Sequence, residues 1–176
     1  MSLARFWSTV KLLHFSKPAG DRPLYRAVKG RVVESVLEVN VGTGARSRTL
    51  ISWLRQQGSE GAIRYAAIDT FEMGGAEHVA LKDFHSELGK LGVKPLPVPN
   101  TGSLAVALKR VAHTIGAVDL VILDCAPVYF TDPAVDAVMN KIVKPTSIVM
   151  AQCAEAEGLW PQEVTRWQST QHRQAA

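Results

Sequence analysis

The chain has little cysteine, no long hydrophobic run and no recognisable metal-binding pattern. Its two cysteines, Cys125 and Cys153, form no C-x-x-C pair and belong to no cluster with metal-ligand spacing. We therefore expect reduced thiols in a cytoplasmic protein and no metal centre. No stretch approaches the roughly 20 consecutive apolar residues that a membrane helix needs. Residues 1–15 also lack the apolar core and cleavage site of a signal peptide.

Neither sign of charge dominates the sequence. Charged residues make up 20% of the 176 positions and hydrophobic residues 47%, with a formal net charge of +4. This composition is ordinary for a globular protein, and the length is enough for one domain with a single core. A solvated surface explains the small basic surplus as well as an anionic partner does. We therefore expect neither a nucleic-acid nor a membrane partner.

The most informative segment is residues 35–44, Ser-Val-Leu-Glu-Val-Asn-Val-Gly-Thr-Gly. It has the pattern of a buried strand that ends in a glycine turn and leads into a helix. Glycines allow close approach of the backbone to a ligand, and a helix start offers free N–H groups. The next apolar run, residues 65–68, ends at Asp69, whose carboxylate can accept hydrogen bonds from a ribose diol. Together these features predict the first half of a nucleotide-binding α/β unit.

This segment resembles the first motif of class I S-adenosylmethionine-dependent methyltransferases, a strand ending in Asp or Glu that is followed by G-x-G-x-G. Glu38, Gly42 and Gly44 match that motif, whereas Asn40 stands where the first glycine is expected. Asp69 matches the acidic residue after the second strand of the family. The resemblance covers residues 33–151 and implies S-adenosylmethionine as a small-molecule cofactor.

The resemblance also implies roles for individual residues. Glu38 and the glycine loop would hold the methionine part of the cofactor, and Asp69 would hold the ribose. Residues 119–124 resemble the fourth strand of the family, with Asp124 at the end where the methyl group is transferred. Asp124 is thus the candidate catalytic base, but the methyl acceptor is not revealed. The residues that the resemblance assigns to cofactor binding are Glu38, Asn40, Gly42, Gly44, Asp69 and Thr70.

Other interpretations remain open. The glycine turn can be purely structural, and Asn40 favours a non-catalytic Rossmann-like binding module. Binding of an NAD-type dinucleotide is a third possibility, although the G-x-G-x-x-G pattern is absent. Residues 124–129 match the D-P-P-Y motif of amino-methylating enzymes loosely, with Tyr129 as its phenol. Arg46 and Arg48, in the first turn of the helix after the glycines, are either solvated or positioned to attract an anion.

The order of the elements predicts the fold. Strands are expected at about 33–39, 62–68, 93–98, 118–124 and 146–151, and the intervening helices at about 45–57, 76–90, 103–115 and 133–143. This alternation predicts an α/β fold with a doubly wound, mainly parallel sheet of about five strands. Right-handed crossovers and the resemblance together give the order 3-2-1-4-5. Prolines at 95, 97 and 99, within and just after the third strand, favour an edge position.

The two ends of the chain differ from the middle. We expect a helical extension at 1–32, a methyltransferase-type domain at 33–153 and a polar tail at 154–176. The tail looks more helical than stranded, although a full methyltransferase domain adds a sixth strand and an antiparallel seventh. The extension is expected to pack near the ligand crevice or to form a homodimer contact, because its apolar side chains form too much surface to leave in water. Trp160 and Trp167 are expected to cover the side of the fifth strand.

Overall fold

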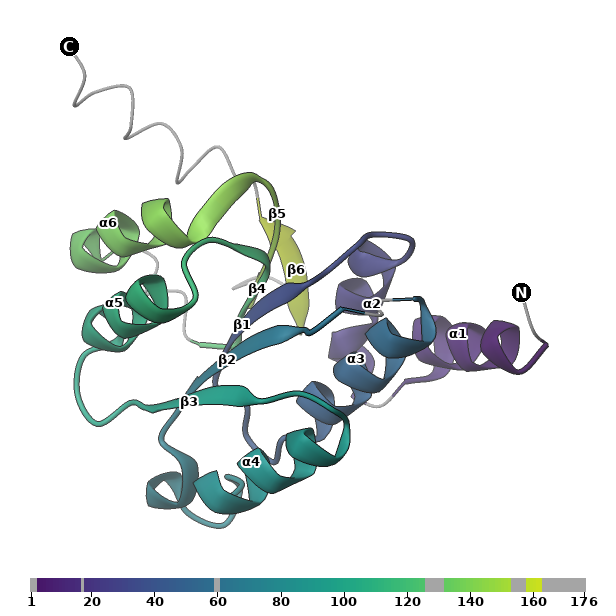
Figure 1. Ribbon diagram of the computed structural model, residues 1–176, viewed down its shortest axis with the longest axis horizontal. Helices are drawn as coiled ribbons and strands as arrows, with labels where there is room; N and C mark the ends of the chain where they lie inside the picture. Colours follow the sequence, from purple (N-terminus) through teal and green to yellow (C-terminus); the bar gives the residue numbers. More distant parts are fainter. Residues whose placement is uncertain (1–2, 17, 59–60, 126–131, 153–157, 163–176) are drawn as a thin grey trace.

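The computed structural model describes residues 3–16, 18–58, 61–125, 132–152 and 158–162. Within them, a six-stranded sheet forms the middle layer, with helices on both faces (Figure 1). The strand order is β3-β2-β1-β4-β5-β6, which confirms the predicted order 3-2-1-4-5 and adds one strand. The first five strands are parallel, and β6 is antiparallel to β5. The strands are β1 (Ser35–Val39), β2 (Arg64–Asp69), β3 (Pro95–Pro99), β4 (Val118–Leu123), β5 (Val143–Gln152) and β6 (Leu159–Gln162).

Helices cover the two faces of the sheet in separate groups. The α-helices are α1 (Leu3–Phe15), α2 (Arg22–Val28), α3 (Ala45–Gln56), α4 (Leu81–Lys90), α5 (Leu104–Thr114) and α6 (Pro133–Ile142), and the short 3₁₀ helices are η1 (Ala19–Asp21) and η2 (Phe71–Gly74). Residues of α5 and α6 pack on one face, and residues of α2, α3 and α4 pack on the other. The sheet is therefore buried on both sides, as a parallel sheet requires.

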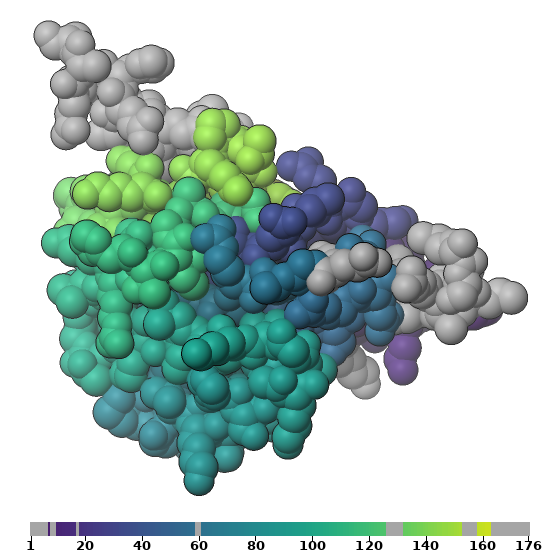
Figure 2. All heavy atoms as spheres, in the orientation of Figure 1, coloured from purple at the N-terminus to yellow at the C-terminus, as the bar shows by residue number. Residues whose placement is uncertain are grey.

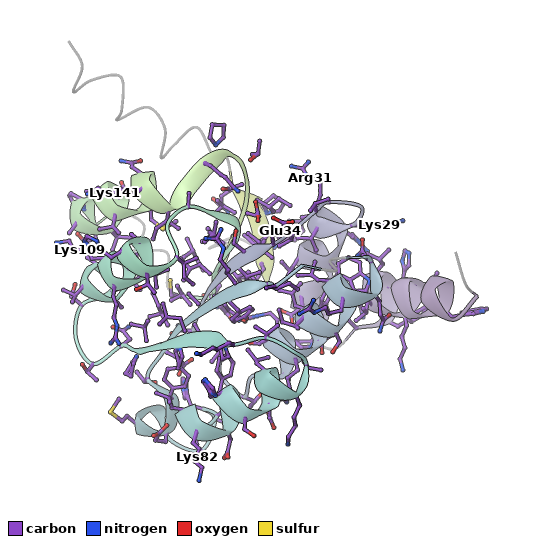
Figure 3. All side chains as sticks on the ribbon, in the orientation of Figure 1. Lys29, Arg31, Glu34, Lys82, Lys109 and Lys141 are labelled. Atoms are coloured by element: carbon purple, nitrogen blue, oxygen red, sulfur yellow. The ribbon has the colours of Figure 1, made fainter. Side chains whose placement is uncertain are left out.

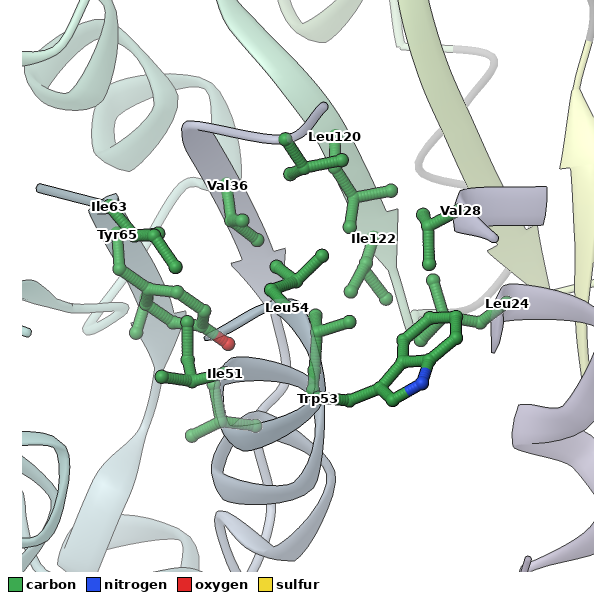
Figure 4. Close-up of a cluster of buried hydrophobic side chains, with 14 of the residues drawn as sticks. Leu24, Val28, Val36, Ile51, Trp53, Leu54, Ile63, Tyr65, Leu120 and Ile122 are labelled. Atoms are coloured by element: carbon green, nitrogen blue, oxygen red, sulfur yellow. The ribbon is translucent and has the colours of Figure 1, made fainter. Parts of the chain in front are cut away.

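The strands β1, β2, β4 and β5 contribute side chains to both cores, because successive side chains of a strand point to opposite faces. Val36 belongs to the cluster beneath α3, and its neighbour Leu37 belongs to the cluster beneath α5 and α6. Figure 4 shows the first cluster, where Trp53 of α3 lies among aliphatic side chains of the sheet and of α2. Trp53 also meets Tyr25 of α2 edge to face, with ring centroids 5.6 Å apart. The amino-terminal extension is thus part of this core.

Two helix starts are set by their surroundings. The expected helix at 76–90 begins instead at Leu81, whose N–H donates to the Glu72 carboxylate at 2.8 Å. The residues before it are held elsewhere, because the Val79 N–H donates to the Gly42 carbonyl at 2.8 Å. Asp132 caps the start of α6, since its side chain accepts from the Ala134 N–H at 2.8 Å.

The expectation of a helical rather than stranded carboxyl-terminal tail is wrong for residues 159–162. They form β6, which pairs with β5 and covers that edge of the sheet. Trp160 lies in this strand, as expected for a residue covering the β5 side, whereas Trp167 is outside the described residues. The edge position of the proline-rich β3 is confirmed at the opposite side of the sheet.

The backbone just before β6 crosses the amino-terminal extension, where Gly158 contacts Gly20. A Cβ added to Gly158 would lie 2.4 Å from the Gly20 Cα, and one added to Gly20 would lie 2.8 Å from the Gly158 Cα. Real Cβ atoms do not approach that closely, so both positions require glycine as the chains are placed. This contact joins the two ends of the described chain beside Asp21.

The first helix packs on α2 and projects from one end of the molecule (Figure 1, Figure 2). Leu13 is buried there, whereas the side chains of Trp7 and Phe15 are 64% and 68% exposed. A homodimer contact through this helix stays a prediction. Figure 3 labels Lys29 just after α2, Lys82 on α4, Lys109 on α5 and Lys141 on α6, so these four cations lie on different elements. Within the described residues, none of the helices is long and apolar enough to cross a membrane.

Candidate functional site

A cluster of charged side chains lies at the carboxyl ends of β1 and β4, and Arg46 of α3 is at its centre. The Arg46 Nε donates to Glu38 Oε1 at 2.6 Å, and its Nη1 donates to Asp124 Oδ2 at 2.6 Å. The same Nη1 lies 3.4 Å from Asp21 Oδ1, and Nη2 donates to the Asn40 carbonyl at 3.0 Å. We call these five residues the Arg46 cluster. It lies at the switch point of the sheet, where open α/β folds bind ligands.

Glu38 is the fully buried member of the Arg46 cluster. It points from β1 toward α3, where the Ser47 hydroxyl donates to Oε2 at 2.7 Å and the Tyr65 hydroxyl donates to the same oxygen. Burial, and then the negative charge of Glu38, raise the pKa of Tyr65 well above its usual range, so the phenol stays a donor. A buried carboxylate is tolerated when a cation and hydrogen-bond donors satisfy it.

Asn40 takes the place of the glycine that the motif predicts, and its backbone explains why. Its φ of 60° lies in the left-handed region, which asparagine tolerates better than most residues. Its side-chain Nδ2 donates to the Asp124 carbonyl at 2.6 Å, and its N–H donates to the Ile68 carbonyl at 2.8 Å. Asn40 therefore keeps the glycine backbone and ties the ends of β1, β2 and β4 together.

A second group of predicted residues lies around Asp69, at the end of β2. Its Oδ2 accepts from the Gly42 N–H at 3.1 Å, so the Asp69 carboxylate lies beside the glycine turn, as expected. Its Oδ1 accepts from the Phe71 N–H at 2.6 Å and lies 2.6 Å from His78 Nδ1. The Thr70 hydroxyl is 3.5 Å from the same oxygen. Asp69 is fully buried, and these internal contacts engage both of its oxygens.

The sequence interpretation missed His78 as a partner of Asp69, because it placed His78 on a helix with His85. The loop folds back at Gly74, where an added Cβ would lie 2.5 Å from His78 Cδ2. The pair Gly74-Gly75 was the available signal for such a tight return. Gly42 and Gly44 have φ values of 55° and 73°, so both match the prediction of a glycine turn.

The two arginines after the glycine turn have different surroundings. Arg46 is neither solvated nor free to attract an anion, because its side chain is 10% exposed and faces three carboxylates. Arg48 forms a partly exposed ion pair with Glu87 of α4.

The sequence interpretation missed Asp21 as a member of the site, because Asp21 lies far from the motif, in the amino-terminal extension. Tyr129 and the rest of the D-P-P-Y likeness after Cys125 fall outside the described residues.

The charges of the Arg46 cluster perturb one another. Burial opposes the charge of Arg46, but Glu38, Asp124 and Asp21 outweigh it and raise the pKa of the guanidinium. Burial also raises the pKa of Asp21, and the pull of Arg46 only partly offsets this. Asp124 has its Oδ1 2.5 Å from the Gln152 amide nitrogen and is the most exposed carboxylate of the cluster.

We predict that Asp21→Asn makes the protein less sensitive to pH. The raised pKa of Asp21 means that the folded protein binds this proton more tightly than the unfolded chain, whose pKa is near 3.8. The contribution of this proton to stability is therefore complete below the unfolded pKa, and it is lost as pH rises through the folded pKa. The variant should lose this dependence, so its stability relative to wild type should rise between acid and neutral pH. Urea denaturation at several pH values measures it, and parallel curves for the two proteins would contradict the prediction.

Hollows lie beside the glycine turn and at the end of β3. One of about 380 Å³ lies between the glycine turn and α4, and His78, Arg48 and Asp83 are among its lining residues. Another of about 230 Å³ lies at the start of α5, after β3. Neither has Glu38 or Asp124 in its lining, and both of those carboxylates accept hydrogen bonds from Arg46. Across the described ranges, no group of three or more His, Cys, Asp or Glu is arranged to hold a metal ion.

Comparison with known proteins finds similar solved structures but no similar sequences. The sequence matches no protein-family model and no curated protein. An O-methyltransferase from Bacillus cereus, crystallised with S-adenosylhomocysteine, aligns with a TM-score of 0.52 and 14% identity over 86% of this chain and 66% of that one. An S-adenosylhomocysteine-bound methyltransferase from Podospora anserina gives 0.52 and 11% over 86% and 62%.

A putative O-methyltransferase from Klebsiella pneumoniae aligns with a TM-score of 0.51 and 14% identity over 98% of this chain and 76% of that one. This chain therefore spans less than two thirds of the Bacillus cereus and Podospora anserina structures and about three quarters of the Klebsiella pneumoniae one. At these identities the likeness concerns the fold. The chain has a divergent, Rossmann-like fold of the class I methyltransferase type.

Proposed function

We propose that this chain binds S-adenosylmethionine, or its demethylated product, in the crevice at the carboxyl ends of β1 and β4. The observation that carries the proposal is the convergence of Glu38, Asn40 and Asp124 at the switch point of the sheet. The Gly42 turn and Asp69 lie next to one another at the neighbouring strand. The similar solved proteins that were crystallised with S-adenosylhomocysteine support the same ligand class.

The roles follow the order of the strands. Glu38, Asn40, Gly42 and Gly44 would hold the methionine part, and Asp69 with Thr70 would face the ribose. The Arg46 cluster contains three carboxylates and one guanidinium, so it favours the positively charged end of such a ligand.

Methyl transfer would use Asp124. When bound, S-adenosylmethionine supplies an electrophilic methyl group, and the chain's part is to align an acceptor beside it. Asp124, whose side chain is 27% exposed, would take the acceptor's proton on a carboxylate oxygen. Its ion pair with Arg46 has to loosen for that role.

A non-catalytic Rossmann-like binding module is the second candidate. Two observations favour it: Arg46 already occupies the carboxylates of the crevice, and Asp69 already accepts hydrogen bonds from Gly42, Phe71 and His78. Such a protein would keep the fold but would not catalyse methyl transfer.

Calorimetric titration tests the binding proposal. S-adenosylmethionine and S-adenosylhomocysteine should each bind with a micromolar dissociation constant, and NAD should give no heat under the same conditions. Absence of heat at millimolar S-adenosylhomocysteine would overturn the proposal and favour the second candidate without a cofactor. If S-adenosylmethionine binds but no S-adenosylhomocysteine forms in the presence of candidate acceptors, the result would favour a binding module that keeps its ligand.

A further inference from the structure

Arg46 lies where the ligand is proposed to lie. Its guanidinium contacts the carboxylates of Glu38 and Asp124 and the carbonyl of Asn40, which are all groups assigned above to the cofactor or the reaction. The side chain is 10% exposed, so it is enclosed between these groups. A ligand and this guanidinium cannot make the same contacts at the same time.

The helix that carries Arg46 is anchored independently of that side chain. The next residue, Ser47, donates to Glu38, while Leu50, Ile51 and Leu54 are buried in the core. Arg46 can therefore leave the crevice by rotating its own side-chain bonds while α3 stays in place. A side chain with four rotatable bonds changes rotamer far faster than a helix moves.

The three carboxylates of the Arg46 cluster favour a cation as the replacement for the Arg46 guanidinium. Removing the guanidinium leaves three carboxylates, one of which is fully buried. Uncompensated charge of this kind is costly, so the position has to be refilled by a positive group. A ligand with an ammonium or sulfonium group meets that requirement, whereas a neutral ligand does not.

We propose that Arg46 is a latch that closes this end of the crevice in the free protein and is displaced when a cationic ligand binds. The inference rests on the proposed function and adds an internal competitor to it. The latch lowers the apparent affinity for the ligand, because binding includes the work of breaking the ion pairs of Arg46. It also links the crevice to the amino-terminal extension through the contact with Asp21.

The test is calorimetric titration of S-adenosylhomocysteine into wild type, Arg46→Gln and Arg46→Lys. Arg55→Gln is the matched control, since Arg55 lies on the same helix but donates to the Gly61 and Gly92 carbonyls at 2.7 and 3.0 Å, away from the glycine turn. Arg46→Gln should bind at least tenfold tighter than wild type, and Arg46→Lys should show a smaller gain. The control should bind as wild type does.

The outcomes separate the latch from the proposed function. Micromolar binding that is equal or weaker in both Arg46 variants would overturn the latch and leave the proposed function standing. Absence of heat with every variant would overturn both. Arg46→Lys keeps a cation beside Glu38, so it serves if Arg46→Gln fails to fold.

A measurement on wild type gives a second readout. The Nε–H resonance of Arg46 in a ¹⁵N-correlated spectrum reports its bond to Glu38. Saturation with S-adenosylhomocysteine should move this resonance to the position of a solvated arginine. A resonance that keeps its position in a saturated sample would overturn the latch.

Discussion

Replacing Arg46 by leucine is expected to lower the free energy of unfolding by about 3–5 kcal/mol. The substitution leaves the carboxylate of Glu38 fully buried without its cation, beside Asp21 and Asp124. Breaking a buried ion pair on one side is costly because the remaining charge is neither solvated nor compensated. Chemical denaturation at neutral pH measures the loss. It should shrink in acid, because protonation of the carboxylates removes the unpaired charge.

Arg48→Leu is the control for this experiment. Arg48 and Glu87 form an ion pair on the surface, and both side chains are 38% exposed. Such pairs contribute about 0–1 kcal/mol, so the control should lose no more than that. If Arg46→Leu were as mild as Arg48→Leu, the Arg46 cluster would not be the tightly enclosed network described here.

Replacing Gly158 by alanine is expected to lower the free energy of unfolding by about 2–5 kcal/mol, from overpacking and left-handed strain together. Its φ is +102°, and the new Cβ would lie 2.4 Å from the Gly20 Cα and 2.6 Å from the Gly20 carbonyl oxygen. Both contacts are with backbone, which cannot rotate away. The substitution should separate β6 from the amino-terminal extension, and denaturant titration measures the effect.

Gly58→Ala separates the two causes. Gly58 has the same φ of +102°, but nothing lies within 4 Å of the Cβ that alanine would add. It should therefore lose only the strain, about 1–2 kcal/mol. The excess loss in Gly158→Ala measures the crossing with Gly20. Equal losses in the two variants would show that the backbone at Gly20 moves away from the new Cβ without a cost in stability.

The sequence by itself determined the layers of the fold and the order of the first five strands. Apolar runs such as residues 120–123 are typical of strands covered on both faces, and such strands occur in parallel sheets with helices on both sides. The glycine turn after β1 was predictable because glycine adopts left-handed φ values, such as the 55° of Gly42, without steric cost. Asp132 before Pro133 likewise marked the start of α6, because an N-cap depends on neighbouring residues alone.

Pairing across the sheet was less predictable at its edge. Residues 159–162 contain a proline and form a short strand without an alternating pattern. They are extended because β5 offers unpaired backbone groups there, and pairing satisfies them. The start of α4 was misplaced for a similar reason, since Gly42 and Glu72 hold the preceding residues by hydrogen bonds.

The state of the crevice was decided by tertiary structure. From sequence, an arginine in the first turn of a helix indicates a solvated cation or an anion site. Arg46 is instead enclosed by carboxylates at positions 21, 38 and 124, which come from three separate parts of the chain. Local pattern cannot reveal this, because the electrostatic partners of a side chain depend on which distant elements the fold brings together. The sequence therefore indicated that Glu38 and Asp124 lie at the carboxyl ends of neighbouring strands, but it did not indicate that Arg46 pairs with both of them.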